Sequence, residues 1–152
     1  MSLPAAAPDG SLERALTELG THQTMLRSGT FVFVVSDFLE PVSATAWHQA
    51  SARGWDVVPV VIQDPIWEAG FPDVWGAALP LGDPGSERIR LVRLSRREAK
   101  RRAYDNAERL RRTLETQRNA GAEPILVQSD DPTSIEAAFT RWADERRGRA
   151  WR

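Results

Sequence analysis

The stretch "FVFVVSDFLEP", residues 31–41, places a run of β-branched and aromatic residues directly before a polar pair, Ser36 and Asp37. Because its apolar residues are continuous rather than alternating, it is typical of a strand covered on both faces, as in a parallel sheet flanked by helices. Residues 55–65 and 123–131 repeat this form, a short apolar run followed by aspartate. The sequence therefore predicts three buried strands with acidic carboxyl ends.

The segments before and between these strands have the features of helices. Residues 11–26 carry leucines at helical spacing, and Ser11 is the expected cap of this helix. Residues 43–54 predict a shorter helix between the cap Ser43 and Gly54, since glycine commonly follows the end of a helix.

The longest predicted helix covers residues 95–120. It begins with a Ser-x-x-Glu capping box at Ser95 and ends before Gly121. A last helix follows the cap formed by Asp131 with Pro132. We expect the apolar faces of both helices to pack on the sheet; they consist of Ala99, Ala103, Ala107, Leu110 and Leu114 in the first, and of Ile135, Phe139 and Trp142 in the second.

Two further features shape the expected sheet. Pro59 lies inside the second strand, and since proline cannot donate a hydrogen bond to the ladder, we expect an edge position or a bulge there. Residues 77–95 form two short extended runs around the turn residues Asp83, Pro84 and Gly85, which predicts a hairpin.

The alternation of helices and strands predicts the fold class. We expect an α/β, Rossmann-like three-layer sandwich with three parallel strands paired in sequence order, a hairpin, and helices on both faces. The chain has 152 residues, enough for one domain. We expect that domain over residues 11–147, a flexible lead over 1–10 that is either natural or left from expression, and a tail over 148–152.

The composition restricts the classes of protein that fit. Residues 1–87 hold 3 Lys or Arg against 11 Asp or Glu, whereas residues 88–118 hold 12 against 4. This segregation indicates a face for nucleic acid or an acidic partner, or a solvated basic helix beside acidic parts of its own fold, and we favour the second. With no cysteine, no apolar run near the roughly 20 residues of a membrane span and no signal peptide, we expect a cytoplasmic protein.

Carboxylates are the main candidates for chemistry. Asp37, Asp64 and Asp131 follow the three predicted strands, at the edge of an α/β sheet where ligands usually bind. They indicate either a metal or ligand contact, best supported for Asp37, or turn and cap chemistry, favoured for the two that precede proline. No phosphate-binding glycine loop or nucleophile motif occurs, and His22 and His48 are distant in sequence.

Three aromatic residues stand close together in "IWEAGFPDVWG", residues 66–76: Trp67, Phe71 and Trp75. The simpler interpretation is that they fold over the sheet. The alternative is a docking patch, because aromatic side chains supply much of the binding energy of protein interfaces.

In order along residues 9–145 occur "DGSLERAL", "VVSDFLEP", "WDVVPVVIQDP", "LGDPGSERIRLVRLS", "AYDNAERLRRTL" and "AGAEPILVQSDDP". This series resembles the bacterial "domain of unknown function 58" family. The resemblance implies the C-terminal half of a domain similar to the von Willebrand factor A fold, of a kind often encoded beside MoxR-type ATPases.

The resemblance also implies a remnant of a metal site. Many A domains bind a metal ion through an Asp-x-Ser-x-Ser loop, a Thr before a helix and an Asp after the fourth strand. By position, Ser11 resembles the second element and Asp37 the third. Because no Asp-x-Ser-x-Ser occurs in the sequence, we expect an incomplete site, no required cofactor, and at most weak binding of Mg²⁺ or Mn²⁺.

We therefore expect a non-enzymatic protein-interaction domain. Its partners would be another protein, for which the resemblance implies a MoxR-type ATPase, and a second copy of the chain paired through the strand at residues 31–36. Two alternatives remain open. One is a Mg²⁺-dependent phosphoesterase or nuclease that uses Asp37 and Asp64, and the other is a nucleic-acid binder that uses the basic helix at 95–120.

Overall fold

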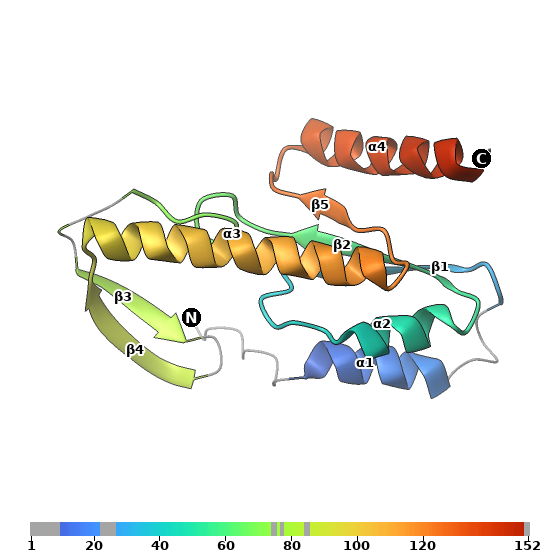
Figure 1. Ribbon diagram of the computed structural model, residues 1–152, viewed down its shortest axis with the longest axis horizontal. Coiled ribbons are helices and arrows are strands. Elements are labelled where there is room, and N and C mark those ends of the chain that lie inside the picture. The colour runs from blue at the N-terminus through green and yellow to red at the C-terminus, as the bar shows by residue number, and fades with distance from the viewer. Residues whose placement is uncertain (1–9, 22–26, 74–75, 77, 84–85, 151–152) are drawn as a thin grey trace.

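The computed structural model describes residues 10–21, 27–73, 76, 78–83 and 86–150 of the chain. Helices and strands alternate as the sequence predicts (Figure 1). The helices are α1 (Ser11–Leu19), α2 (Ala44–Ser51), α3 (Arg96–Asn119) and α4 (Pro132–Ala150). The strands are β1 (Phe31–Ser36), β2 (Asp56–Ile62), β3 (Ala78–Asp83), β4 (Ser86–Arg93) and β5 (Ile125–Val127).

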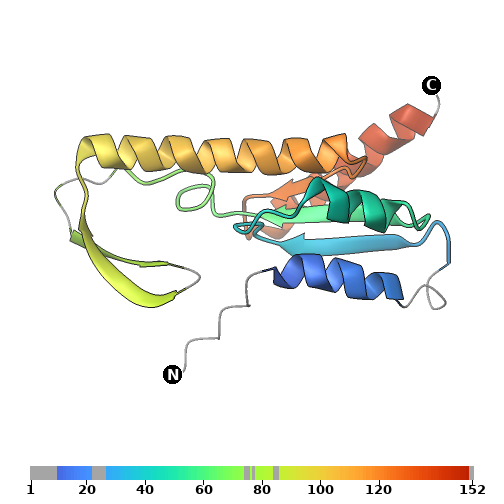
Figure 2. The same cartoon turned by 60° about the horizontal axis from the view of Figure 1, so that its bottom comes forward.

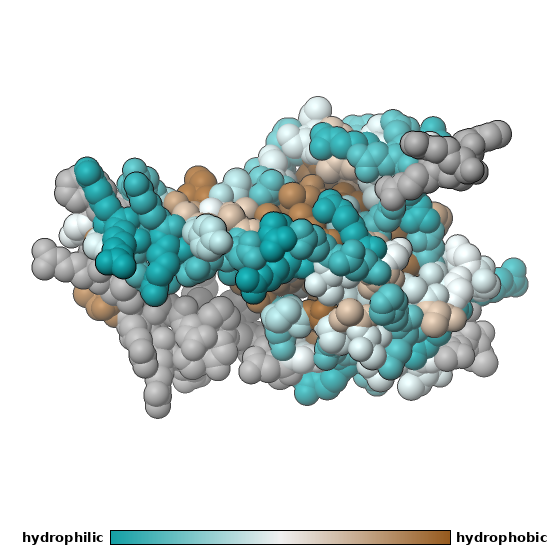
Figure 3. Space-filling model, viewed as in Figure 1, coloured by the Kyte–Doolittle hydropathy of each residue, from teal (hydrophilic) through white to brown (hydrophobic). Residues whose placement is uncertain are grey.

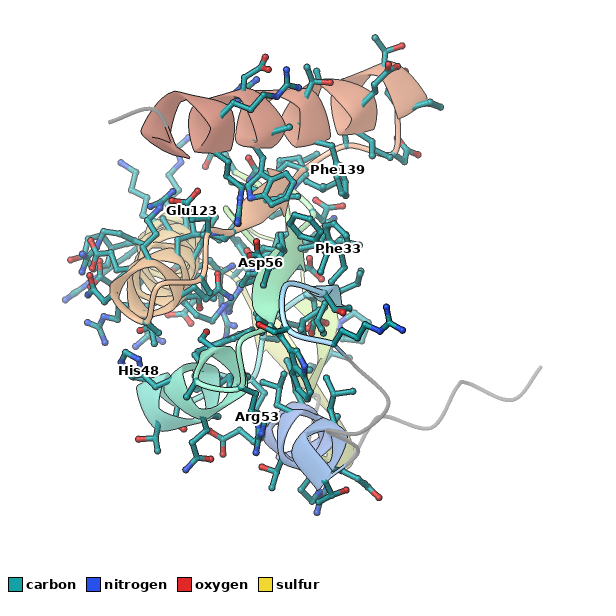
Figure 4. All side chains as sticks on the ribbon, turned by 90° about the vertical axis from the view of Figure 1, so that its right-hand side faces the viewer. Phe33, His48, Arg53, Asp56, Glu123 and Phe139 are labelled. Atoms are coloured by element: carbon teal, nitrogen blue, oxygen red, sulfur yellow. The ribbon has the colours of Figure 1, made fainter. Side chains whose placement is uncertain are left out.

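Strands β1, β2 and β5 form one parallel sheet in the order β1-β2-β5, which confirms the predicted pairing in sequence order. Helices cover both faces: α4 lies on one, and α1, α2 and part of α3 lie on the other (Figures 2 and 4). The arrangement is the predicted α/β, partial Rossmann-like sandwich. Strands β3 and β4 pair antiparallel as the expected hairpin, whose turn residues 84–85 lie outside the described part of the chain.

The two faces of the sheet have separate cores. On the α1, α2 and α3 face, Val57 and Val61 of β2 pack with the aromatic side chains of Phe38 and Trp47, and Leu16 of α1 joins this cluster. On the other face, Val58, Val60 and the β5 valine and isoleucine pack against the predicted inner face of α4, which consists of Ile135, Phe139 and Trp142 together with Ala138.

The outer face of β1 is only partly covered, so the prediction that both faces of this strand are buried is wrong. Val34 is buried, but Phe31, Phe33 and Val35 remain 52%, 47% and 59% exposed. Trp142 meets the edges of both phenylalanine rings at centroid distances of 6.1 Å. Phe139 and Arg146 of α4 also contact the Phe33 and Phe31 rings, but α4 lies mainly over β2 and β5 and leaves the far end of β1 open.

Pro59 lies in the central strand without a bulge, since β1 and β2 stay in register across it, with Val34 opposite the proline. The N–H of Gln63 donates to β5, and backbone direction alternates along a strand, so position 59 also faces the β5 side. However, β5 begins at Ile125 opposite Val60. The missing N–H of Pro59 therefore falls just outside the β5 ladder, on a stretch of β2 that has one strand neighbour among the described residues.

The helix caps match the sequence predictions except at α1. The Ser43 hydroxyl accepts a hydrogen bond from Ala46 N–H, and Ser95 accepts one from Glu98 N–H, as expected of N-caps. The cap of α1 is Gly10, which has a φ of 72°, and Ser11 is the first helical residue. The prediction of Ser11 as the cap was therefore wrong by one position.

Only the second half of helix α3 packs against the core of the β1-β2-β5 sheet. Leu110 and Leu114 pack against the core, and Ala120 and Gln117 are buried at its end. The predicted apolar stripe is broken at Ala107, which is exposed because the preceding turns project past the sheet together with the β3–β4 hairpin (Figure 2). Near its N-terminus, Ala99 is buried again, beside the hairpin.

At the C-terminal end, α4 continues through Ala150, into the segment that we expected to be a tail. Within the described ranges, no helix has both the length and the apolar character that crossing a membrane requires.

Candidate functional site

The loop after β1 is held by a network of hydrogen bonds. Asp37 Oδ1 accepts from Leu39 N–H at 3.1 Å, and the backbone oxygen of Asp37 accepts from Gln63 Nε2 at 2.7 Å. The Ser36 hydroxyl accepts from Phe38 N–H at 3.1 Å. The carboxylate at the end of this strand therefore stabilises the turn that follows.

This turn places Phe38 in an unusual backbone conformation. Its φ is 50°, a left-handed value that bulky residues rarely adopt, and its side chain is 2% exposed. The ring packs on Trp47 of α2 with a centroid distance of 5.9 Å. Burial of this ring and the surrounding hydrogen bonds offset the cost of the conformation, and such strained positions cluster at functional sites.

The N-terminal end of α1 lies beside the same loop, so Ser11 and Asp37 are at one edge of the sheet (Figure 2). Gly10 N–H donates to the Glu40 carboxylate. Glu13 Oε1 accepts from Ser43 N–H at 2.6 Å, and the hydrogen bonds from Ser43 lower the pKa of this carboxyl. The contacts at this edge are thus helix-end and loop contacts.

The other two acidic strand ends have local roles. Asp64 Oδ1 accepts from Ile66 N–H at 2.7 Å and from Trp67 N–H at 3.0 Å, as in a turn. Asp131 Oδ2 accepts hydrogen bonds from the backbone N–H and the hydroxyl of Ser134. Asp131 thereby caps α4, and the same hydrogen bonds lower its pKa. The interpretation of both residues as turn and cap residues is therefore supported.

Carboxylate and imidazole groups do not cluster at these positions among the described residues. Within the described part of the chain, no three or more His, Asp or Glu side chains come close enough together to hold a metal ion. Ser11 and Asp37 share an edge of the sheet, but the carboxylate of Asp37 already accepts hydrogen bonds from its own loop.

The aromatic residues after β2 pack on α3 rather than over the sheet. Trp67 and Phe71 meet edge to face at 5.7 Å, and Arg102 lies 5.8 Å over the Phe71 ring. Asn106 and Arg109 of α3 donate to backbone oxygens of this loop. Trp67 keeps 49% of its surface exposed. The third predicted member of this set, Trp75, lies outside the described residues.

A cavity of about 580 Å³ opens between α3 and the loop after β1. This volume is in the range of small-ligand and peptide pockets. One wall is apolar and consists of Phe38, Pro41, Val42 and Trp47. The other wall is the polar side of α3, including Arg109, Arg112, Thr113 and Gln117. We call this cavity the α3 groove.

Gln117 is the residue of the α3 groove that the sequence analysis missed. Its side chain is 1% exposed, and both amide atoms lack a hydrogen-bond partner in the described part of the chain. The Nε of Arg109 is also buried and, among the described residues, unpartnered. The sequence held a signal for this residue. Gln117 follows Leu110 and Leu114 at helical spacing, so a polar side chain is expected on the buried face of the helix.

Four arginines of α3 form ion pairs with glutamates of the same helix: Arg101, Arg102, Arg111 and Arg112. Glu108 contacts Arg111 at 2.8 Å and Arg112 at 2.7 Å, and these guanidinium groups lower the pKa of Glu108 to about 2. Glu98 binds Arg101 and Arg102 in the same way. Figure 3 shows the resulting hydrophilic surface along the helix. The predicted basic helix is thus hydrophilic on its surface, but these ion pairs lie within the helix itself rather than with the acidic first half of the chain.

Strand β1 forms one edge of the three-stranded sheet. Asp56 N–H donates to Thr30 C=O, so the even-numbered residues of β1 point their backbone groups toward β2. The backbone groups of Phe31, Phe33 and Val35 consequently point away from the sheet, and no other described strand pairs with them. Phe33 lies toward Phe139 of α4 (Figure 4), and Phe31 contacts Trp142 of the same helix. Since side chains alternate along a strand, Val35 shares this partly covered face.

The family described as Protein of unknown function DUF58 matches residues 1–114, about three quarters of the chain. The chain belongs to the DUF58 family. This confirms the family that the sequence series resembles. The match spans the elements from α1 into α3 and ends before β5 and α4. No curated protein and no solved structure gave a significant match.

Proposed function

We propose that this DUF58 chain is a non-enzymatic, cytoplasmic protein-interaction domain of bacterial type and that β1 is its docking strand. The observation that carries the proposal is the coincidence, at Phe31, Phe33 and Val35, of exposed apolar side chains with outward-pointing backbone groups. An exposed apolar edge strand pairs readily with a strand of another chain. An extended partner segment would form main-chain hydrogen bonds with the backbone of Phe31, Phe33 and Val35 and apolar contacts with their side chains.

The partner that fits this edge most simply is a second copy of the chain. Antiparallel pairing of two β1 strands about a two-fold axis at Phe33 would place each Phe31 opposite the Val35 of the partner. The two sheets would then form one continuous sheet, and the interface would be self-complementary. Asp37 of each chain would lie at opposite ends of the paired strands.

Charge placed on the edge tests this dimer. Val35→Glu adds a carboxylate at the most exposed position of the edge, where it opposes pairing with little effect on the fold. Leu91→Glu is the matched control, because Leu91 is 76% exposed on the β4 strand of the hairpin. Light scattering over a tenfold dilution from about 100 μM should show a dimer for the wild type and for Leu91→Glu, and a monomer for Val35→Glu. A wild-type chain that is monomeric throughout, or a Val35→Glu chain that stays dimeric, contradicts the proposal.

The resemblance to a partial von Willebrand factor A domain supports a second partner, a MoxR-type ATPase. We propose that this ATPase binds the same domain without a metal ion as a bridge, because the described residues offer no complete ligand set. Binding of a purified MoxR-type ATPase from the same genome, measured with and without EDTA, tests this. Calorimetric titration of the chain with Mg²⁺ or Mn²⁺ tests separately whether it binds a metal ion. Low-micromolar binding at one site would overturn the proposal that no metal ion forms a bridge.

The two alternatives have less support from the geometry. Three glutamates of α3 neutralise arginines that a nucleic-acid binder would need: Glu98, Glu108 and Glu115. An Asp37-dependent hydrolase would lose turnover in the Asp37→Asn variant, and a nucleic-acid binder would lose affinity steeply with salt. We expect neither effect.

A further inference from the structure

We propose that the α3 groove binds an extended, uncharged peptide segment of a partner protein. The groove lies between α3 and the loop after β1, on the opposite face of the sheet from α4, and is separate from the β1 edge. The inference therefore depends neither on the dimer nor on a MoxR-type ATPase. It rests on unsatisfied hydrogen-bonding groups, an apolar wall and a balance of charge.

The hydrogen-bonding groups of the groove match the backbone of a peptide. The Gln117 amide carries a donor and an acceptor, and the Nε of Arg109 is a donor; these atoms are buried in the α3 wall of the groove, and none has a partner in the described part of the chain. A peptide unit offers the complementary pair, C=O and N–H. The two residues are eight positions apart on α3, or about 12 Å along the helix axis. An extended segment of about four residues, at about 3.3 Å each, spans this distance.

The apolar wall gives such a segment a place for one large side chain. Trp47 and Phe38 form its centre, and Val42 and Pro41 extend it. Phe38 is held there in its left-handed conformation by the hydrogen bonds of the Ser36–Asp37 turn. The wall is therefore fixed before a ligand arrives, which reduces the entropy that binding costs.

The charges of the groove favour a neutral ligand over a phosphate-bearing one. Asp105 and Glu108 balance Arg109 and Arg112 along the polar wall. Glu108 accepts from the Arg112 guanidinium, and Arg109 donates to the backbone oxygen of Glu68. Since these guanidinium groups are already engaged, the groove offers no clustered positive charge for nucleic acid or phosphopeptides.

Selection from a phage-displayed library of linear random nonapeptides tests the proposal, with the wild-type chain as bait. Recovered sequences are synthesised with capped, uncharged ends, and their affinity is measured by fluorescence polarisation. The Gln117→Leu variant removes the buried amide but keeps its size, so we expect at least about tenfold weaker binding. Its thermal midpoint should be equal or higher, because that amide has no hydrogen-bond partner among the described residues. Gln49→Leu, at an exposed position of α2, is the control and should bind as the wild type does.

Two further measurements separate a peptide site from a structural polar group. Thr113→Trp fills the groove from its α3 wall while keeping the Gln117 amide in the chain, and it should also abolish binding. N-methylation of successive peptide bonds should weaken binding at one or two positions only, those that face Gln117 and Arg109. A selection that yields no peptide, peptides that bind Gln117→Leu as tightly as the wild type, or a preference for phosphorylated sequences would overturn the proposal.

Discussion

The two faces of β1 behave differently although they belong to one continuous apolar run. On the α2 face, Val34 is buried in a core that includes Trp47 and Leu16. On the α4 face, Phe33 and Val35 keep 47% and 59% of their surface exposed. The first face is closed by three helices, whereas the second receives only the edge of one (Figure 4).

This difference separates apolar residues that the fold uses from apolar residues that it leaves available. Burial of large side chains supplies most of the stability of a domain, so residues on the closed face should dominate unfolding. Residues on the open face contribute less to the isolated chain and more to an assembly. Mutations on each face should therefore change different measurements.

The largest effect is expected for Trp47→Ala on the closed face. Trp47 is 1% exposed and packs on the Phe38 ring, so its removal leaves a cavity. We expect a loss of about 3 to 5 kcal/mol in the free energy of unfolding, measured by urea denaturation of the monomer. Trp67→Ala, at a half-exposed tryptophan, is the control with a much smaller loss. Equal losses for the two would show that the closed face is not the main core.

Leu114→Ala tests how much the packing of α3 on the closed face contributes to stability. Leu114 is only partly buried but packs against the core cluster. We expect a loss of about 2 kcal/mol, near the lower end for a leucine truncation, in the same denaturation experiment. Ala107→Gly, on the exposed and projecting side of the helix, reports only helix propensity, about 1 kcal/mol. A loss below about 0.5 kcal/mol for Leu114→Ala would reject the assigned contact of this helix.

Phe33→Ala addresses the open face and should separate stability from assembly. Its ring touches Phe139 and Trp142, so we expect a loss of about 1 kcal/mol in the unfolding of the monomer. The dimer dissociation constant should rise at least about tenfold in sedimentation equilibrium, because the ring lies at the proposed two-fold axis. If the stability loss equals that of Trp47→Ala, the distinction between the two faces fails.

The smallest effect concerns the outer surface of α3 at low pH. Arg111 and Arg112 lower the pKa of Glu108 from 4.5 to about 2 in the folded chain. A carboxyl with a depressed folded pKa contributes stability that is present above the unfolded pKa and lost as pH falls through the folded pKa. The wild type should therefore lose slightly more stability between pH 5 and pH 2 than Glu108→Gln does. Glu136→Gln on α4 serves as the control, and identical pH profiles for wild type and Glu108→Gln would contradict the pairing.

Much of the fold follows from local sequence patterns. The three strands, their parallel order and the caps Ser43 and Ser95 were predicted correctly, because apolar runs and capping residues act within a few positions of the chain. The coverage of β1 was predicted wrongly. Its composition shows that the strand is apolar, but the placement of α4 across the sheet decides which of its faces is closed.

The candidate sites were less predictable than the fold. Acidic residues at the strand ends left two interpretations open, a metal or ligand contact and turn or cap chemistry. The contacts of Asp64 and Asp131 are those of a turn and a cap, which the proline after each residue favoured. The α3 groove is lined by residues about 80 positions apart, such as Phe38 and Gln117. The left-handed conformation of Phe38 has no marker in its own sequence, since bulky residues rarely adopt it.

The position of Pro59 has a consequence for the dynamics of the chain. Because the β5 ladder starts only at Val60, β5 pairs with the sheet over three residues, and the 62 residues between β2 and β5 must close a long loop first. Such a short, late-forming contact is the natural boundary of a unit that opens by itself. We expect β5 and α4 to detach transiently while α1, β1, α2 and β2 stay folded, so that amide hydrogens of β5 exchange with solvent faster than those at the centre of β2. Each opening would expose the sides of Phe31 and Phe33 that α4 otherwise covers. A partner strand paired with the β1 edge could then contact a larger apolar area than when α4 is docked.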